Sequence, residues 1–156
     1  SLKKGIFITG NVGTGKTNLL KAFQFNRRKC FEAITAVNIT TKMKDVERKE
    51  DQGFWKYYCD YVPNASGQNK YFLQNQIGWM IDDLGTEKEV NIFGNKIDPI
   101  YSIILNRYEK PEMYQGLHVT TNLSGEMIEN RYDLRFRDRL KVMFNIFKMT
   151  GQSRRQ

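Results

Sequence analysis

The feature that most constrains this chain is the stretch Gly10-Asn11-Val12-Gly13-Thr14-Gly15-Lys16-Thr17, which has the spacing G-x-x-x-x-G-K-T. An apolar run at 5–9 predicts a buried strand before it, and apolar residues spaced for one helical face follow it. In this context the glycines let consecutive backbone N–H groups point toward one anion. A glycine turn that merely precedes a lysine is the alternative, but a chance match in a chain of this size has a probability on the order of one per cent or less.

The residue types in this loop suit a nucleoside triphosphate with magnesium. The side chain of Lys16 can reach the β- and γ-phosphates, and the hydroxyl of Thr17 can take a place on Mg²⁺. The residues expected to contact the nucleotide are therefore Gly10, Asn11, Val12, Gly13, Thr14, Gly15, Lys16, Thr17 and Leu19.

Length and composition indicate one globular domain with a substantial core. The chain has 156 residues, of which 40% are hydrophobic, and no apolar run approaches the ~20 residues that a membrane span needs. The net charge of +8 favours polyanionic partners such as nucleic acid, although a protein that handles triphosphates is expected to be basic in any case. Because the chain begins five residues before its first strand, we expect it to be excised from a longer protein with an N-terminal partner-binding segment.

The cysteines and the histidine indicate a reducing environment and no metal centre of their own. Cys30 and Cys59 do not form a metal-binding pair, and beside a nucleotide site they predict free thiols in the cytoplasm. The only histidine, His118, cannot anchor a histidine metal site and stands in an apolar run, where a core position is expected.

Strands and helices alternate along the chain, which predicts a parallel sheet with helices on both faces. The first helix is expected to end at about Phe25, and a charged helix capped by Thr40 or Thr41 is expected to end at Lys49. Further helices are expected from near Pro99, from Ser124 and, rich in arginine, over 132–141. The strands after the first are expected at 33–39, 77–81, 116–122 and 143–148, with a polar loop around Gly94.

An aromatic stretch at 54–61 allows two interpretations. Aromatic side chains beside lysines can stack on nucleic-acid bases. Aromatic residues at helical spacing more often belong to a core, and this interpretation is favoured.

Polar residues follow two of the expected strands, where ligands bind in parallel sheets. Asp82 can hold Mg²⁺ through its water shell, and Asp83 can polarise the attacking water. Asn122 can hydrogen-bond that water or the γ-phosphate. Turn formation or helix capping is the alternative for these residues, but the phosphate loop upstream favours catalysis.

Four segments, at 81–87, 106–108, 120–124 and 135–140, resemble the AAA+ ATPase core of the DnaC/DnaI helicase loaders, to which the IstB transposition helpers are related. The resemblance covers nearly the whole chain and keeps the motifs in order. It implies one AAA+ ATPase domain over 1–156 with an α/β P-loop NTPase fold, a three-layer sandwich around a mostly parallel five-stranded sheet. It also implies Walker A at Gly10 to Thr17, Walker B ending at Asp82-Asp83, and sensor 1 at Asn122.

The resemblance extends to three arginines. Arg139 corresponds to the arginine finger donated in trans to a neighbouring subunit, and Arg135 is a secondary candidate. Arg155 corresponds to the sensor 2 arginine. The basic residues over 131–141 occupy more than one helical face, so some of them are expected to be solvated or to contact a nucleic-acid backbone.

Two departures from the family pattern bear on activity. Many AAA+ proteins have glutamate where Asp83 stands, and the shorter side chain predicts slow turnover, with Glu87 as an alternative base. The chain also ends at the last expected strand, so the helical lid is expected to be minimal or absent.

The resemblance therefore implies an ATPase that uses ATP and Mg²⁺ and self-associates as a ring or helical oligomer with ATP between subunits. Turnover would be coupled to loading a replicative helicase on single-stranded DNA, through a helicase-binding segment not in this chain and without a membrane. The alternatives are an IstB-like transposition helper and a nucleotide-gated binding module with little turnover. A small-molecule kinase is less supported, because no arginine-bearing lid is evident in the sequence.

Overall fold

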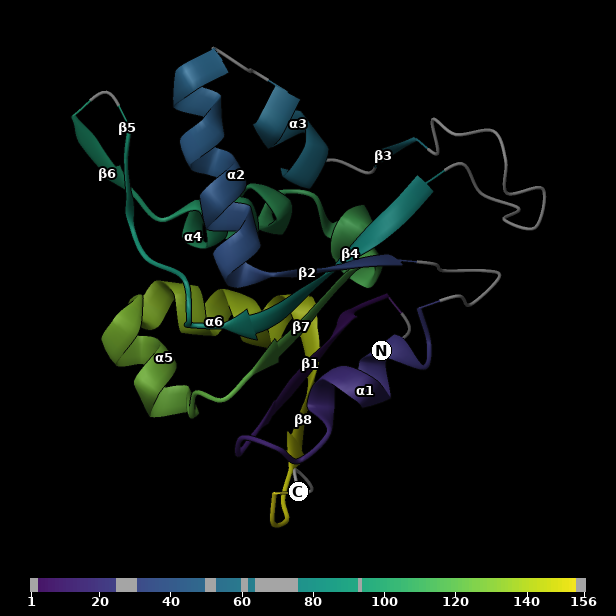
Figure 1. Cartoon of the computed structure of the whole chain (residues 1–156). Helices are drawn as coiled ribbons and strands as arrows, with labels where there is room; N and C mark the ends of the chain where they lie inside the picture. Colours follow the sequence, from purple (N-terminus) through teal and green to yellow (C-terminus); the bar gives the residue numbers. More distant parts are fainter. Residues whose placement is uncertain are drawn as a thin grey trace.

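Five parallel strands form the central sheet of the structure, a computed structural model that describes residues 3–24, 31–49, 53–59, 62–63, 76–92 and 94–153. The strands lie side by side in the order β2-β4-β7-β1-β8 (Figure 1). Their bounds are β1 Gly5–Gly10, β2 Phe31–Thr35, β4 Gln76–Leu84, β7 Leu117–Thr121 and β8 Phe144–Met149. A short strand, β3 (Val62–Pro63), pairs antiparallel with β4. The prediction of a mostly parallel five-stranded sheet is confirmed.

The two faces of the sheet carry cores of different size. Successive residues of a strand point to opposite faces, so Phe7 and Ile8 of β1 belong to different clusters. Phe7 joins the larger core, which draws on α2 (Ala36–Lys49), α3 (Gly53–Cys59), α4 (Pro99–Tyr108) and α6 (Leu134–Met143). Ile8 packs in the smaller core with Leu20 of α1 (Lys16–Lys21). Helices therefore cover both faces, and the three-layer arrangement is confirmed.

The boundary between β2 and α2 differs from the prediction. The strand ends at Thr35, and the helix begins at Ala36 rather than after Thr40 or Thr41. The hydroxyl of Thr35 accepts a hydrogen bond from the N–H of Asn38, which is capping geometry. Buried Ala36 and Ile39 occupy one face of the helix, and their apolar character is what suggested a longer strand.

Three other bounds also differ. Strand β4 continues through Asp82 and Asp83 to Leu84, so the acidic pair lies inside the strand rather than after it. The expected polar loop around Gly94 contains an antiparallel hairpin, β5 (Val90–Ile92) with β6 (Asn95–Ile97). Helix α1 ends at Lys21, whereas the predicted end at Phe25 lies outside the described residues.

Side-chain caps begin three helices of the larger layer. Asp98 accepts from the N–H of Tyr101 at α4, and Ser124 accepts from the N–H of Met127 at α5 (Gly125–Arg131), where a helix start was predicted. Asp133 accepts from the N–H of Phe136, so α6 begins at Leu134 rather than at 132. This bond is the main cause that lowers the pKa of Asp133 below its usual range. A 3₁₀ helix, η1 (Pro111–Gly116), leads from α4 into β7.

The described part of the aromatic stretch belongs mainly to the core. Phe54 and Tyr58 are buried, and Tyr57 is the member that remains exposed. The fully buried Arg107 of α4 donates from Nε to the carbonyl of Tyr58 at 2.9 Å and so joins α3 to α4. Each described helix is too short or too polar to span a bilayer.

A buried carboxylate, that of Glu87, ties the segment after β4 to the helical layer. One oxygen accepts from the N–H of Gly85 at 2.7 Å, and the other accepts from the hydroxyl of Tyr132. The guanidinium of Arg131 lies 3.4 Å from the carboxylate. Burial and the neighbouring carboxylate raise the pKa of Tyr132, which keeps its hydroxyl protonated as a donor.

Replacing Glu87 with Ala is expected to lower the free energy of unfolding by about 3 kcal/mol, because it leaves Arg131 and buried donors without their acceptor. The exposed Glu89, 4.0 Å from Lys96, is the control. Its alanine variant is expected to lie within about 0.5 kcal/mol of the unsubstituted protein in urea unfolding. Equal effects of the two substitutions would contradict a structural role for Glu87.

Candidate functional site

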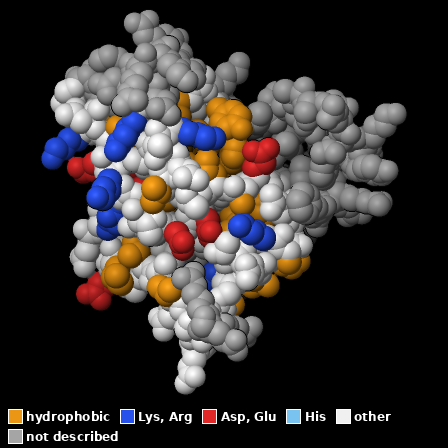
Figure 2. Space-filling model, in the orientation of Figure 1, with side chains coloured by type: hydrophobic (Ala, Val, Ile, Leu, Met, Phe, Trp, Pro, Cys, Tyr) orange, Lys and Arg blue, Asp and Glu red, His pale blue; other side chains and the backbone are white. Residues whose placement is uncertain are grey.

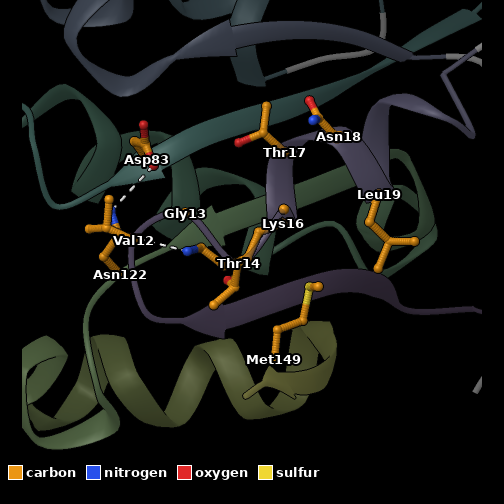
Figure 3. A pocket seen from close by; sticks show the side chains of 11 residues that line it. Val12, Gly13, Thr14, Lys16, Thr17, Asn18, Leu19, Asp83, Asn122 and Met149 are labelled. Carbon is orange, nitrogen blue, oxygen red and sulfur yellow. Dashed lines mark hydrogen bonds between the residues drawn. The ribbon is translucent and has the colours of Figure 1, made fainter. Parts of the chain in front are cut away.

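The three polar segments expected to form the site meet at one edge of the sheet. The loop after β1, the acidic pair of β4 and Asn122 after β7 all lie at the carboxyl ends of neighbouring parallel strands. They border a cavity of about 520 Å³, a size typical of small-molecule sites. Figure 3 shows Asp83 and Asn122 on one side of this cavity, with Leu19 and Met149 toward the other.

The loop takes a conformation that requires glycine at two of its positions. Gly15 has φ 93° and stands directly before α1. Gly13 has φ 82°, and a Cβ added there would lie 2.1 Å from the Ser153 hydroxyl oxygen, so the segment after β8 passes directly against the loop. The hydroxyl of Thr14 donates to the carbonyl of Asn11 at 2.9 Å and closes the turn.

The ammonium group of Lys16 is held inside the loop by three oxygen acceptors. It donates to the carbonyls of Gly10 and Asn11, both at 2.8 Å, and to Oδ1 of Asn122 at 2.7 Å. The residue is only 5% exposed. An ammonium has three donors, so these three bonds match its capacity. An anion in the cavity would take over part of this set.

Side-chain hydrogen bonds join the acidic pair to Thr17 and to Asn122. The hydroxyl of Thr17 donates to Oδ1 of Asp82 at 2.8 Å. The amide of Asn122 donates to Oδ1 of Asp83 at 3.5 Å, while its carbonyl oxygen accepts from Lys16. Asn122 thus bridges the lysine and the second carboxylate.

A bulge in β4 brings both carboxylates to the same end of the site. The pairing with β7 shifts between Ile81 and Leu84, so Asp82 and Asp83 together lie opposite Thr120. Asp83 has φ 56° and is the one described residue other than glycine with a positive φ. In a regular strand the two side chains would point to opposite faces. With the bulge, Asp82 reaches Thr17 and Asp83 lines the cavity.

The left-handed backbone at Asp83 also bears on the residue type. Aspartate and asparagine tolerate this conformation better than residues with longer or branched side chains. The geometry thus offers a physical reason for aspartate at a position where many AAA+ proteins have glutamate.

Not all of the predicted site residues come together here. Val12 and Leu19 line the cavity as expected, and Asn18 and Met149 line it as well, although sequence reasoning did not single them out. The carboxylate of Glu87 is committed to Gly85 and Tyr132, so Glu87 as an alternative base does not agree with the structure. Arg155 lies outside the described residues.

The arginines of α6 lie away from this cavity in their own chain. The guanidinium of Arg139 stacks over the ring of Tyr108 at 5.1 Å, and Arg135 is exposed. Arg137 is paired with Glu129. Among the described carboxylates, none forms an ion pair with Arg135 or Arg139.

Thr17 and Asp82 fit a magnesium ion by their chemistry. Their oxygens are hard donors 2.8 Å apart, and Mg²⁺ takes few protein ligands while phosphates and waters complete its shell. Within the described residues no group of three or more histidine, cysteine or acidic side chains forms a metal cluster.

The charges on the face shown in Figure 2 are mixed. Lysine and arginine side chains alternate there with acidic and hydrophobic ones. His118 is nearly buried in β7, and its Nδ1 accepts from the N–H of Ile6, as expected for a core histidine. Three consecutive basic residues, Arg27, Arg28 and Lys29, lie outside the described residues.

Neither a protein-family model nor a curated protein matches the sequence. Solved structures do match the fold. AMPPCP-bound DnaA from Aquifex aeolicus has a TM-score of 0.62 with 19% identity over 97% of this chain and 42% of its own. Replication initiator DnaA bound to AMPPCP and single-stranded DNA has a TM-score of 0.63 with 16% identity and the same two coverages. Domain III of the Thermotoga maritima DnaA has a TM-score of 0.58 with 15% identity over 94% of this chain and 54% of that one.

The chain thus spans less than half the length of the first two of these proteins. At these identities the likeness concerns the fold. The parallel sheet, its flanking helices and the loop after β1 show that this chain has the α/β fold of these DnaA structures.

Proposed function

We propose that this chain is the ATP-binding and ATP-hydrolysing domain of a DNA replication protein of the helicase-loader type. One observation carries the proposal: hydrogen bonds through Asn122 join Lys16 to Asp83, and all three residues line one cavity. Thr17 lines the same cavity and donates to Asp82. Two of the structures with the same fold are DnaA proteins bound to AMPPCP, one of them also to single-stranded DNA, which supports a nucleotide and a replication context.

The roles of the residues follow from their positions. The loop N–H groups cradle the phosphates, and Lys16 exchanges carbonyl acceptors for phosphate oxygens. Thr17 and Asp82 hold magnesium, which when bound neutralises charge on the β- and γ-phosphates. Asp83 orients the attacking water and accepts its proton, and Asn122 holds both Asp83 and the γ-phosphate side of the site.

Turnover is expected to be slow. The side chain of Asp83 is one methylene shorter than that of glutamate, so its carboxylate is expected to hold the attacking water less closely. A nucleotide-gated binding module with little turnover is therefore the second candidate. An IstB-like transposition helper would use the same site, and only its partner would differ.

The arginine expected to complete the site belongs to a neighbouring copy of the chain. Arg139 lies outside the cavity of its own subunit, and its guanidinium rests on Tyr108 without a carboxylate partner among the described residues. A guanidinium supplied in trans suits the spread charge of the phosphoryl-transfer transition state. ATP would then lie between subunits of a ring or helical oligomer, and hydrolysis would time the loading of a replicative helicase on single-stranded DNA.

Two variants are expected to affect ATP binding and ATP hydrolysis differently. Lys16→Ala removes the phosphate-binding cation and should abolish ATP binding. Asp83→Asn keeps the size and the tolerance of the left-handed backbone, so ATP binding should stay within about twofold while hydrolysis falls by about 100-fold or more. Equilibrium binding of a fluorescent ATP analogue and single-turnover hydrolysis measure the two effects. Glu89→Gln is the control, because this exposed carboxylate lies outside the site. Unchanged hydrolysis in Asp83→Asn would favour the binding module.

Mixing two inactive variants tests the arginine in trans. Arg139→Ala should bind ATP normally and lose about 10³-fold in hydrolysis, and hydrolysis per subunit of the unsubstituted protein should rise with protein concentration. A mixture of Arg139→Ala and Asp83→Asn should regain activity, because about a quarter of the randomly formed interfaces combine an intact Asp83 with an intact Arg139. No recovery on mixing would place Arg139 outside the shared site. Recovery with Arg135→Ala instead would transfer the role to Arg135.

A further inference from the structure

A fully buried hydroxyl, that of Thr120 in β7, lies at the centre of the β4 bulge. Its oxygen accepts a hydrogen bond from the backbone N–H of Asp83 at 3.0 Å. The same hydroxyl donates to Oδ1 of Asp82. One side chain thus binds both members of the acidic pair, one through its backbone and the other through its carboxylate.

The direction of these two bonds is fixed by the chemistry of the groups. A backbone N–H can only donate, so Thr120 must accept from Asp83 and point its own proton at the carboxylate of Asp82. Oδ1 of Asp82 then accepts from Thr17 as well. The result is one polarised chain from the bulged backbone through Thr120 to the oxygen that faces the phosphate loop.

The bulge explains why a side chain is needed at this point. Because two residues of β4 lie opposite one residue of β7, the regular backbone ladder is interrupted at Asp83. The hydroxyl of Thr120 supplies the missing acceptor inside the sheet. In doing so it stabilises the left-handed conformation that directs the carboxylate of Asp83 into the cavity.

We propose that Thr120 is a positioning residue that sets the geometry of both carboxylates, Asp82 toward the metal and Asp83 toward the attacking water. The proposal rests on the ATPase function proposed above for the role of the carboxylates. The neighbouring Thr121 cannot substitute, because its hydroxyl donates to the carbonyl of Leu84 and accepts from the N–H of Leu123.

Three variants distinguish the effect of the Thr120 hydroxyl from the effect of its side-chain shape. Thr120→Val keeps the β-branched shape and strand preference but can neither accept from Asp83 nor donate to Asp82. Thr120→Ser restores the hydroxyl without the methyl group. Thr40→Val is the matched control, since Thr40 is equally a buried threonine, and its hydroxyl bonds the carbonyl of Ala36 within α2.

The first readout is hydrogen exchange of the Asp83 amide in the nucleotide-free full chain, followed by NMR. In the unsubstituted protein this amide should be protected although the strand is bulged. In Thr120→Val its exchange should accelerate by about 10-fold or more, and Thr120→Ser should recover the protection. An unprotected amide in the unsubstituted protein would overturn the proposal even if Thr120→Val failed to fold.

The second readout is the Mg²⁺ concentration that half-saturates binding of a slowly hydrolysed ATP analogue. Groups that orient a metal ligand typically affect affinity or activity by 10–100-fold, so Thr120→Val should raise this concentration by about 10-fold. It should also lower kcat by about 10- to 100-fold with little change in KM, because the phosphate loop is untouched. Thr120→Ser should recover most of both losses, and Thr40→Val should show neither.

The outcomes distinguish this proposal from the proposed ATPase function. A folded Thr120→Val with unchanged Mg²⁺ dependence, or a Thr120→Ser as impaired as the valine variant, would overturn the positioning role. If the unsubstituted chain binds the analogue but hydrolyses no ATP, the ATPase proposal fails. Amide exchange and Mg²⁺ dependence would then still decide the role of Thr120.

Discussion

The hydrogen bond between the hydroxyl of Thr17 and the carboxylate of Asp82 joins residues that are 65 positions apart in the sequence. Thr17 lies in α1, which follows β1, and Asp82 lies in β4, which is not a neighbour of β1 in the sheet. Strand β7 lies between β1 and β4, so this hydrogen bond spans the carboxyl end of β7. It can form because the three strands are parallel and end at the same edge of the sheet. The parallel alignment of β1, β7 and β4 therefore determines where the loop, the acidic pair and Asn122 lie.

The site combines a buried cation with two carboxylates in a small volume. Carbonyl and amide oxygens hold Lys16, while hydroxyl and amide donors hold the acidic pair. Neutral groups therefore stabilise each charge where it lies. A bound triphosphate would bring negative charge to Lys16, and its metal would bring positive charge to the acidic pair. The neutral groups that now hold these side chains could then be replaced by the phosphates and the metal.

The part of the site that is local in the sequence could be predicted, and the part that depends on strand pairing could not. The loop from Gly10 to Thr17 carries its conformation in its glycines, and the acidic pair follows an apolar run. The bulge at Asp83 depends on the register with β7, which no local pattern encodes. For the same reason the sequence alone assigns no role to Thr120, which lies in the segment 120–124.

Two further differences between the predictions and the structure also arise from contacts between distant parts of the sequence. Glu87 resembles a site residue because it follows two aspartates, but its carboxylate is bound by Arg131 and Tyr132, which lie about 44 residues further along. Apolar residues at 33–39 suit a strand and a helix equally, and packing of Ile39 in the larger core decides for the helix. The in-trans role of Arg139 stays a prediction, because it concerns a second copy of the chain.

The place of β1 in the sheet has a consequence for how the chain acquires its shape. Among the described strands of this sheet, β1 is synthesised first, whereas its two neighbours, β7 and β8, are synthesised last. One edge of β1 lacks its partner until β7 is synthesised, and the other edge lacks its partner until β8 is synthesised. During this time an apolar strand is exposed to wrong pairing. Closing such a long loop costs conformational entropy before any sheet contact offsets it, so folding of this domain is expected to be slow. The same order means that the cavity at the loop after β1 is completed only when β7 and β8 are in place, because Asn122 and Met149 line it.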